Sequence, residues 1–425
     1  MDNNNYKQQN NIKQNKENTM QKYEQNREQY NGQNAGYENY EYQNNDPTMG
    51  NDYRNIQANN SYDNFEYRNQ QLYNGYEQSN SINEYPDDDT LVQGDLMKGF
   101  APDAHDLAVD AHDLAVQRTG GEVQGVSVVE EETDNAKITR IDVMNEQGAQ
   151  TIGKPIGRYV TIESDGLKGQ NRMVHDEISE IFANELQAII NFDQLRPHPN
   201  LEPTIFVVGL GNWNATADAL GPQVLNHLMV TRHLYQEAPP ELRKGLRPVC
   251  ALSPGVLGLT GVQTAEIIKG VVQMVQPDLI IAIDALAARH TGRLANTIQI
   301  SNTGIAPGSG IGKARMAINQ ETMNIPVVAV GIPTVVHAMT IVNDAMEEML
   351  KGDIFSKVER ERFRHIEERE KKRMIGNILG PFMGGMVVSP KGIDELILDV
   401  GRILAGGINV ALHPDITPEN LSLYL

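Results

Sequence analysis

Two aspartates stand where two apolar runs end. Asp218 lies in GLGNWNATADALGP, which continues the apolar run TIFVVGLG, and Asp284 lies in DLIIAIDALA. Continuous apolar runs of this length are typical of buried strands, and catalytic groups of open parallel sheets gather beyond the carboxyl ends of the strands. If the two carboxylates converge, they cannot readily ionise together, so one keeps a proton while the other can act as a base toward water. Such a pair predicts a peptidase that needs neither a metal nor a nucleophilic side chain.

Each aspartate also has a structural interpretation. Asp218 immediately precedes a predicted helix and is suited to be its N-cap or to lie in its first turn. Asp284 is embedded among apolar residues, where a carboxylate needs a partner or a raised pKa, and it could instead accept hydrogen bonds from backbone amides. A further alternative is that the two carboxylates hold a divalent ion in a metal-dependent hydrolase.

Other catalytic motifs are incomplete or absent. GLGNWNATA lacks the third glycine of a dinucleotide-binding loop, and PGSGIGKA has Pro307 and Ala314 where a phosphate-binding loop has its first glycine and its Ser/Thr. The sequence contains no G-x-S-x-G and no H-E-x-x-H. We therefore expect no cofactor and no metal. The remaining candidates are scattered histidines without ligand spacing, expected to be exposed or satisfied: His175, His227, His290, His337 and His413.

Two singular residues are expected to serve packing. Cys250 is the one cysteine of the chain and lies in the apolar setting RPVCALSP, so it predicts a buried, unreactive thiol and excludes a disulfide framework. Trp213, the one tryptophan, is expected to pack rather than to contact substrate.

The elements that must position the aspartates alternate along the middle of the chain. The predicted fold class is α/β, with a mostly parallel sheet, helices on both faces and a small antiparallel element. The antiparallel element is expected from residues 138–144 and 157–164, after an acidic segment at 128–135. Strands are expected within residues 204–211, 247–255, 278–287, 296–302, 325–336 and 384–390, and helices within 175–190, 219–234, 264–276, 358–379 and 392–412.

The first part of the chain differs in composition. Residues 1–95 are dominated by Asn, Gln, Tyr, Glu and Asp, with few aliphatic residues, and we expect a disordered tail. The formal charge of −20 argues against direct nucleic-acid binding. The sequence has no signal-peptide core and no run of about 18 apolar residues, so a cytoplasmic protein that does not contact a membrane is expected.

A heptad is written twice in DAHDLAVDAHDLAV, Asp103 to Val116, where the tail gives way to the predicted globular region. The repeat has two interpretations. It is either a short amphipathic helix with Leu107 and Leu114 on one side, or an exposed segment that is cut.

Five stretches closely resemble the germination protease family of endospore-forming bacteria. They are VVGLGNWNATADALGP, ALSPGVLGLTGVQTAEIIKGVV, PDLIIAIDALAARHTGRLANTIQISNTGIAPGSGIG, IPVVAVGIPTVV and ILGPFMGGMVVSPKGIDELI. The resemblance extends from about residue 105 to residue 414. The tail before it has no counterpart in the family pattern.

The resemblance implies an aspartic-type endopeptidase of the forespore and spore core that degrades small acid-soluble spore proteins. It also implies a homotetrameric, self-processing zymogen whose fold is similar to that of hydrogenase-maturation proteases. The family's proposed catalytic pair falls on Asp218 and Asp284. A non-enzymatic module that binds spore proteins remains an alternative.

The resemblance also interprets the repeat. Family precursors carry a similar segment at the start of the mature chain, with an acid, an apolar residue, two small or apolar residues and another acid. Asp106 to Asp110 fit this pattern, so the expected cut lies between Asp106 and Leu107, after a pro-segment of residues 96–106 and before a peptidase domain of residues 107–425. The second copy fits less well, because Gln117 replaces its closing acid.

Overall fold

The structure is a computed structural model that describes residues 107–195, 202–306, 316–351 and 386–418, together with residues 366, 370, 374–377, 379 and 420. The expected tail (1–95), the expected pro-segment (96–106) and the loop at 307–314 lie outside the described residues. So does most of the helix expected at 358–379.

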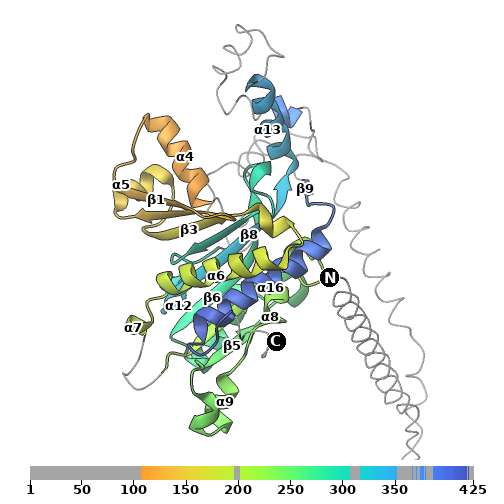
Figure 1. Ribbon diagram of the computed structural model, residues 1–425. Helices are drawn as coiled ribbons and strands as arrows, with labels where there is room; N and C mark the ends of the chain where they lie inside the picture. Colours follow the sequence, from red (N-terminus) through yellow and green to blue (C-terminus); the bar gives the residue numbers. More distant parts are fainter. Residues whose placement is uncertain are drawn as a thin grey trace, which may run out of the picture. The chain divides into compact units, whose positions relative to one another are not determined.

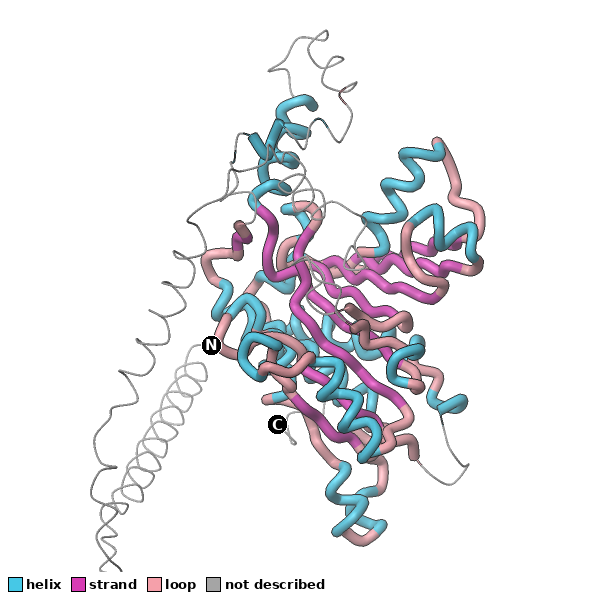
Figure 2. Tube along the Cα trace, turned by 180° about the vertical axis from the view of Figure 1, so that it is seen from behind, coloured by secondary structure: helices cyan, strands magenta, loops and turns pink. Residues whose placement is uncertain are grey.

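One sheet runs through the described part of the chain (Figure 1), and Figure 2 shows the same strands from behind. The strands pair in the order β1-β2-β3-β7-β8-β6-β4-β5, and β9 pairs with β8. Their bounds are β1 Val126–Glu132, β2 Lys137–Val143, β3 Gly157–Glu163, β4 Ile205–Gly209, β5 Val249–Leu252, β6 Leu279–Ala288, β7 Thr297–Ser301, β8 Val327–His337 and β9 Val387–Val388.

The two halves of the sheet differ in strand direction. β5, β4, β6 and β8 pair in parallel, whereas β8, β7, β3, β2 and β1 pair antiparallel. The connection between β6 and β7, residues 289–296, is too short to return the chain for a parallel strand. The α/β class is therefore confirmed. The antiparallel element, expected as a small addition, forms the other half of one mixed sheet.

Helices cover both faces of the sheet, as expected. One face packs against α6 (Arg172–Ile189), α8 (Leu220–Leu225) and α16 (Ile393–Leu412), and Figure 1 shows α6 and α16 side by side across it. The opposite face packs against α11 (Thr264–Val275) and α12 (Gln320–Met323) over the parallel half. Over the antiparallel half it packs against α4 (Ala108–Thr119) and α5 (Glu146–Ile152).

The remaining helical elements are short or lie in connections. They are α7 Phe192–Leu195, α9 Arg232–Glu237, α10 Leu257–Thr260 and α13 Ala338–Lys351, with the 3₁₀ turns η2 Asp165–Lys168, η3 Thr216–Asp218, η4 Pro240–Arg243 and η5 Thr291–Arg293.

The helix expected over residues 219–234 is two helices, α8 and α9. The backbone between them has partners elsewhere: Met229 N donates to Asn409 Oδ1 (2.8 Å) and Thr231 N donates to Val249 O (3.0 Å). These bonds replace the hydrogen bonds that would continue a helix.

Most of the acidic segment at residues 128–135 belongs to β1, which forms an edge of the sheet. Its side chains are mostly exposed, and Glu130 and Glu131 form ion pairs with Lys137 and Arg140 of β2. Charged residues on an edge strand disfavour pairing with another chain.

Candidate active site

Two neighbouring parallel strands bring the predicted aspartates to one place. The last residue of β4, Gly209, is the partner of Ile283 in β6. Leu210 N then donates to Ile283 O (2.8 Å), so the chain leaves β4 level with Asp284. The loop that follows carries Asp218, which ends η3 just before α8.

The Asp218 loop is closed by its own hydrogen bonds. Asn212 N donates to the Asp218 carboxylate at Oδ2 (3.0 Å) and to its main-chain oxygen (3.0 Å). Thr334 of β8 donates its hydroxyl to Ala217 O (2.6 Å), which ties the loop to the sheet. The N-cap of α8 is Ala219, and no side chain makes a cap hydrogen bond there. The interpretation of Asp218 as an N-cap is therefore wrong.

Gly211 allows the loop to close this tightly. Its φ is +112°, a conformation that favours glycine. A Cβ at this position would lie 1.9 Å from Asp218 O and 3.4 Å from Asp218 Oδ1. The glycine is thus required for the position of the half-buried Asp218.

Asp284 is buried in the parallel half of the sheet, and its side chain is 7% exposed. Asp284 lies on the same face of β6 as Ile280 and Ala282, which pack on the side of the sheet covered by α11 and α12. Burial raises the pKa of Asp284, and the nearby negative charge of Asp218 raises it further, to about 8. A hydrogen bond from Ala285 N (2.9 Å) acts in the opposite direction and is outweighed.

The structure therefore brings Asp218 and Asp284 together, with unequal environments. Asp284 retains a proton at neutral pH, whereas Asp218 is half-buried and accepts a hydrogen bond from a backbone amide. When burial raises the pKa of one of two neighbouring carboxyl groups, that group can serve as the acid and the other as the base. This arrangement can activate water on one carboxylate and protonate a carbonyl oxygen from the other.

The start of α4 lies on the same face of the sheet as Asp284. Asp284 of β6 is the strand partner of Gly331 in β8, and Gly331 is the partner of Gln299 in β7. The three residues therefore lie in one row across the sheet. Gln299 Oε1 accepts a hydrogen bond from Ala108 N (3.0 Å) at the beginning of α4. Leu107, the second half of the expected cut, is 3% exposed in an apolar cluster that includes Leu286.

The other predicted residues are distributed as follows. Asp106, the first half of the expected cut, lies outside the described residues. Cys250, predicted to be buried, is half-buried; partial burial raises the pKa of its thiol, which donates to Ile205 O (3.6 Å). Trp213 packs one ring edge against Gly255 and is 49% exposed, so it is less buried than a core residue.

The histidines are placed in separate environments. His413 is fully buried, accepts or donates at both ring nitrogens, and burial lowers its pKa to about 4. His175 contacts Gly169 O (2.8 Å), and His290 contacts Asp344 (3.3 Å). Among the residues that the structure describes, no three His, Cys, Asp or Glu side chains are grouped as a metal site.

Sequence reasoning missed Asn212 and Thr334 as supports of the acid pair. Asn212 acts through its backbone amide, which any residue carries, and Thr334 sits in a β-branched strand where threonine needs no special explanation. It also missed the ion pair between Asp110 and Arg293. Within the described ranges, no helix is long and apolar enough to cross a membrane.

The fold and the site together define an α/β protein with two neighbouring carboxyl groups beside the end of a parallel strand. Such a pair is suited to catalyse hydrolysis. A family model described as germination protease matches residues 101–365 and 361–425. The chain therefore belongs to the germination protease family and is a peptidase.

Individual relatives agree over most of their length. The germination protease of Clostridium perfringens (strain ATCC 13124) is 46% identical over 326 residues, which are 75% of this chain and 98% of the relative. That of Clostridium tetani is 42% identical over 75% of this chain and 98% of its own. That of Geobacillus sp. (strain WCH70) is 38% identical over 76% and 95%.

A crystal structure of the [NiFe] hydrogenase maturation protease HycI from Thermococcus kodakarensis is similar over 49% of this chain and 92% of its own. Its TM-score is 0.26 and its sequence identity 17%. The α/β class accordingly stands on the strand pairing of the chain itself.

Proposed function

We propose that this chain is an aspartic-type endopeptidase that begins the degradation of small acid-soluble spore proteins during germination. The observation that carries the proposal is the juxtaposition of Asp218 with the buried, proton-retaining Asp284 in a member of the germination protease family. The names of the relatives support a role in germination. The forespore and spore core are the compartment in which such a substrate would be met.

The two carboxyl groups divide the chemistry. Asp218, as the carboxylate, removes a proton from a water molecule, whose oxygen attacks the carbonyl carbon of the peptide bond. Asp284 donates its proton to the carbonyl oxygen, which gives a neutral tetrahedral intermediate. When the carbon–nitrogen bond breaks, the leaving nitrogen takes the proton from Asp218, and Asp284 recovers a proton from the hydroxyl group. Both groups then return to their starting states.

The chain is made as a zymogen that cuts itself between Asp106 and Leu107. The position of Leu107 and Ala108 supports this, since Leu107 shares an apolar cluster with Leu286 of β6 and Ala108 contacts Gln299, on the face of the sheet that carries Asp284. The segment can block the site until it is removed, which would keep a preformed peptidase inactive. A homotetramer is proposed from the family resemblance.

Self-processing is expected to give a mature chain that begins at Leu107. Asp106→Asn should slow this cut by about tenfold or more, because it removes the acid beside the bond. The matched change Asp113→Asn, at an exposed side chain of the second copy, should leave the cut unchanged. Mass spectrometry of the intact product measures both. A mature N-terminus away from Leu107 would contradict the assignment.

The metal-dependent alternative makes a different prediction. If the acid pair works without metal, EDTA should leave the rate of peptide cleavage unchanged, because a proton held by Asp284 replaces the metal as the group that polarises the carbonyl. The measurement is the cleavage rate of one peptide before and after chelation. Loss of activity that a divalent metal restores would favour the rival.

Gly211→Ala is expected to reduce peptide cleavage by about 100-fold, because a displaced catalytic group loses most of its effect. The added Cβ would meet the main chain of Asp218. Gly258→Ala is the matched control, since a Cβ there meets no atom within 4 Å. Rates should be compared at equal fractions of folded protein. A wild-type rate in Gly211→Ala would show that the loop geometry is not needed.

A further inference from the structure

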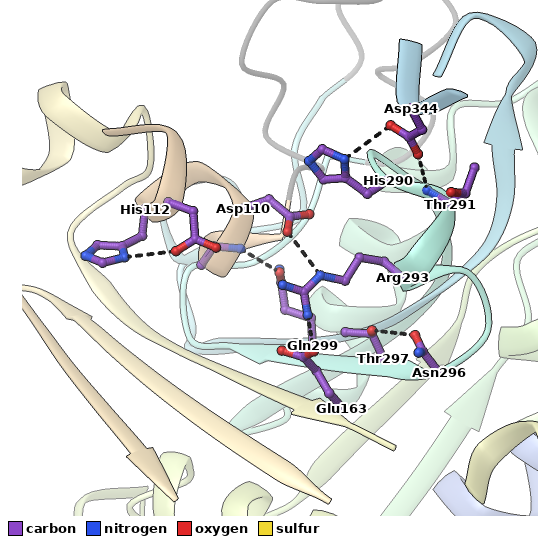
Figure 3. A network of polar contacts seen from close by, with 12 residues as sticks. Asp110, His112, Glu163, His290, Thr291, Arg293, Asn296, Thr297, Gln299 and Asp344 are labelled. Carbon is purple, nitrogen blue, oxygen red and sulfur yellow. Dashed lines mark hydrogen bonds and ion pairs between the residues drawn. The ribbon is translucent and has the colours of Figure 1, made fainter. Parts of the chain in front are cut away.

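The start of α4 makes a series of contacts that resembles a held peptide. Leu107 inserts into an apolar cluster with Tyr159 and Leu286. Ala108 N donates to Gln299 Oε1 (3.0 Å). Asp110 places its carboxylate against Arg293, with Arg293 Nε 3.1 Å from Asp110 Oδ1. Figure 3 shows Gln299 and Arg293 side by side beneath this turn. A side-chain pocket, a backbone contact and a charge contact thus follow one another within four residues.

Arg293 is also held by contacts that do not involve Asp110. It ends the turn η5, in which Arg293 N donates to His290 O (3.0 Å). The same turn is tied to α13 by Thr291 N, which donates to Asp344 Oδ2 (2.6 Å). The guanidinium also pairs with Glu163 of β3. An arginine held in this way presents a fixed fork to an incoming carboxylate.

The ion pair between Asp110 and Arg293 carries a large desolvation cost, because both charges are largely buried. The side chains of Asp110 and Arg293 are 3% and 16% exposed, so both charges lose most of their contact with water. Asp110 Oδ2 has no hydrogen-bond partner among the described residues. An apolar pair of similar size would fix a helix at least as well as a buried ion pair. A charge at this place is better explained by a need to select an acidic residue.

We propose that Arg293 is a specificity-determining residue that binds the acidic side chain of the fourth residue after the cut bond, both in the chain's own segment and in its substrate proteins. The inference rests on the proposed function and extends it, because it assigns the closing acid of the cleavage sequence to one side chain. The ligand class is an acidic peptide in which an apolar residue is followed three positions later by Asp or Glu.

The proposal also predicts that the chain is cut between Asp106 and Leu107 rather than between Asp113 and Leu114. The cleavage sequence that begins at Asp106 closes with Asp110, which forms an ion pair with Arg293, whereas the one that begins at Asp113 has Gln117 at the equivalent position. Asp110 remains in the chain after the cut at Leu107. It therefore competes with a substrate for Arg293 as long as it keeps this ion pair.

The test compares two peptides with the sequence of residues 101–114, one with Asp and one with Asn at the position of Asp110. In the self-processed wild-type protein, kcat/KM should favour the Asp peptide by about tenfold or more. In Arg293→Met the preference should fall to about one, and in Arg293→Lys it should be intermediate. Arg402→Met, which removes an exposed arginine of α16, should keep the wild-type preference. The preference is a ratio within one protein, so a change in the folded fraction cancels.

A wild-type measurement covers the case in which the Arg293 variants do not fold. The product peptide that begins at Leu107 should inhibit the wild-type protein about tenfold more strongly than the same peptide with Asn for Asp110. Three results would overturn the role of Arg293 and leave the proposed function standing. They are equal cleavage of both peptides, equal inhibition by both products, and a retained preference in Arg293→Met. A wild-type protein that cuts neither peptide would contradict the proposed function itself.

Discussion

Asp284→Asn is expected to reduce peptide cleavage by about 10³-fold or more, because an amide cannot donate the proton that the carbonyl oxygen requires. The substitution keeps the size of the side chain, and Oδ1 can still accept the hydrogen bond from Ala285 N. The variant should therefore remain folded. Initial rates on one peptide, measured beside the exposed-site control Asp142→Asn, test this expectation.

The same variant should change how stability depends on pH. Burial and the Asp218 charge raise the pKa of Asp284 from 3.8 to about 8 in the folded chain. Between these values the folded chain binds a proton that the unfolded chain releases, so the wild-type free energy of unfolding falls as pH rises from about 4 to about 8. Asparagine does not titrate. The stability of Asp284→Asn relative to wild type should thus increase by a few kcal/mol across this window.

Urea unfolding at pH 5 and pH 8 measures this difference. The free energy of unfolding of the variant, relative to that of the wild type, should be higher at pH 8 than at pH 5. The variant should be inactive at both pH values. A variant that cleaves at the wild-type rate would exclude Asp284 from catalysis. Equal pH dependence of stability in the two proteins would show that Asp284 is ionised in the fold.

Asp218→Asn is expected to reduce cleavage by a similar factor of about 10³, because an amide cannot take a proton from water. Its second effect separates it from a structural substitution. The negative charge of Asp218 contributes to the raised pKa of Asp284, so its removal should lower that pKa below about 8. Asn212 N can still donate to the amide oxygen, which should preserve the loop.

This variant also tests the non-enzymatic alternative. A module that only binds spore proteins would keep its full function with Asn at position 218, since the change alters a single charge in a chain of formal charge −20. Binding of an acid-soluble spore protein and its cleavage should be followed in the same experiment. Loss of cleavage with retained binding is the outcome expected for a peptidase.

The parallel half of the fold could be predicted because three of its four strands, β4, β6 and β8, are buried on both faces. Strands of this kind are written as continuous apolar runs, and a charged residue inside such a run is conspicuous, as Asp284 is in DLIIAIDALA. The end of β4 could be placed from its glycines. Both aspartates were therefore found, although their convergence depends on β4 and β6 being neighbours, which only the fold establishes.

The rest depends on contacts between distant parts of the chain. Alternating strands indicate an antiparallel element but not which sheet edge it joins, so the continuity of β3 with β7 could not be predicted. Asp110 and Arg293 are 183 positions apart, and no local pattern in the sequence indicates that they form a pair. The helix expected at residues 219–234 failed for a similar reason, since its backbone bonds to α16 and β5.

The most direct test of the account is the titration of the Asp284 carboxyl group by ¹³C NMR of aspartate-labelled protein, with Asp284→Asn used to assign the signal. The account predicts an apparent pKa of about 8 in the wild type, and a lower value in Asp218→Asn. An Asp284 signal that titrates near the ordinary value of 3.8, or one that is unmoved by the loss of Asp218, would contradict a proton held by Asp284 beside a charged Asp218.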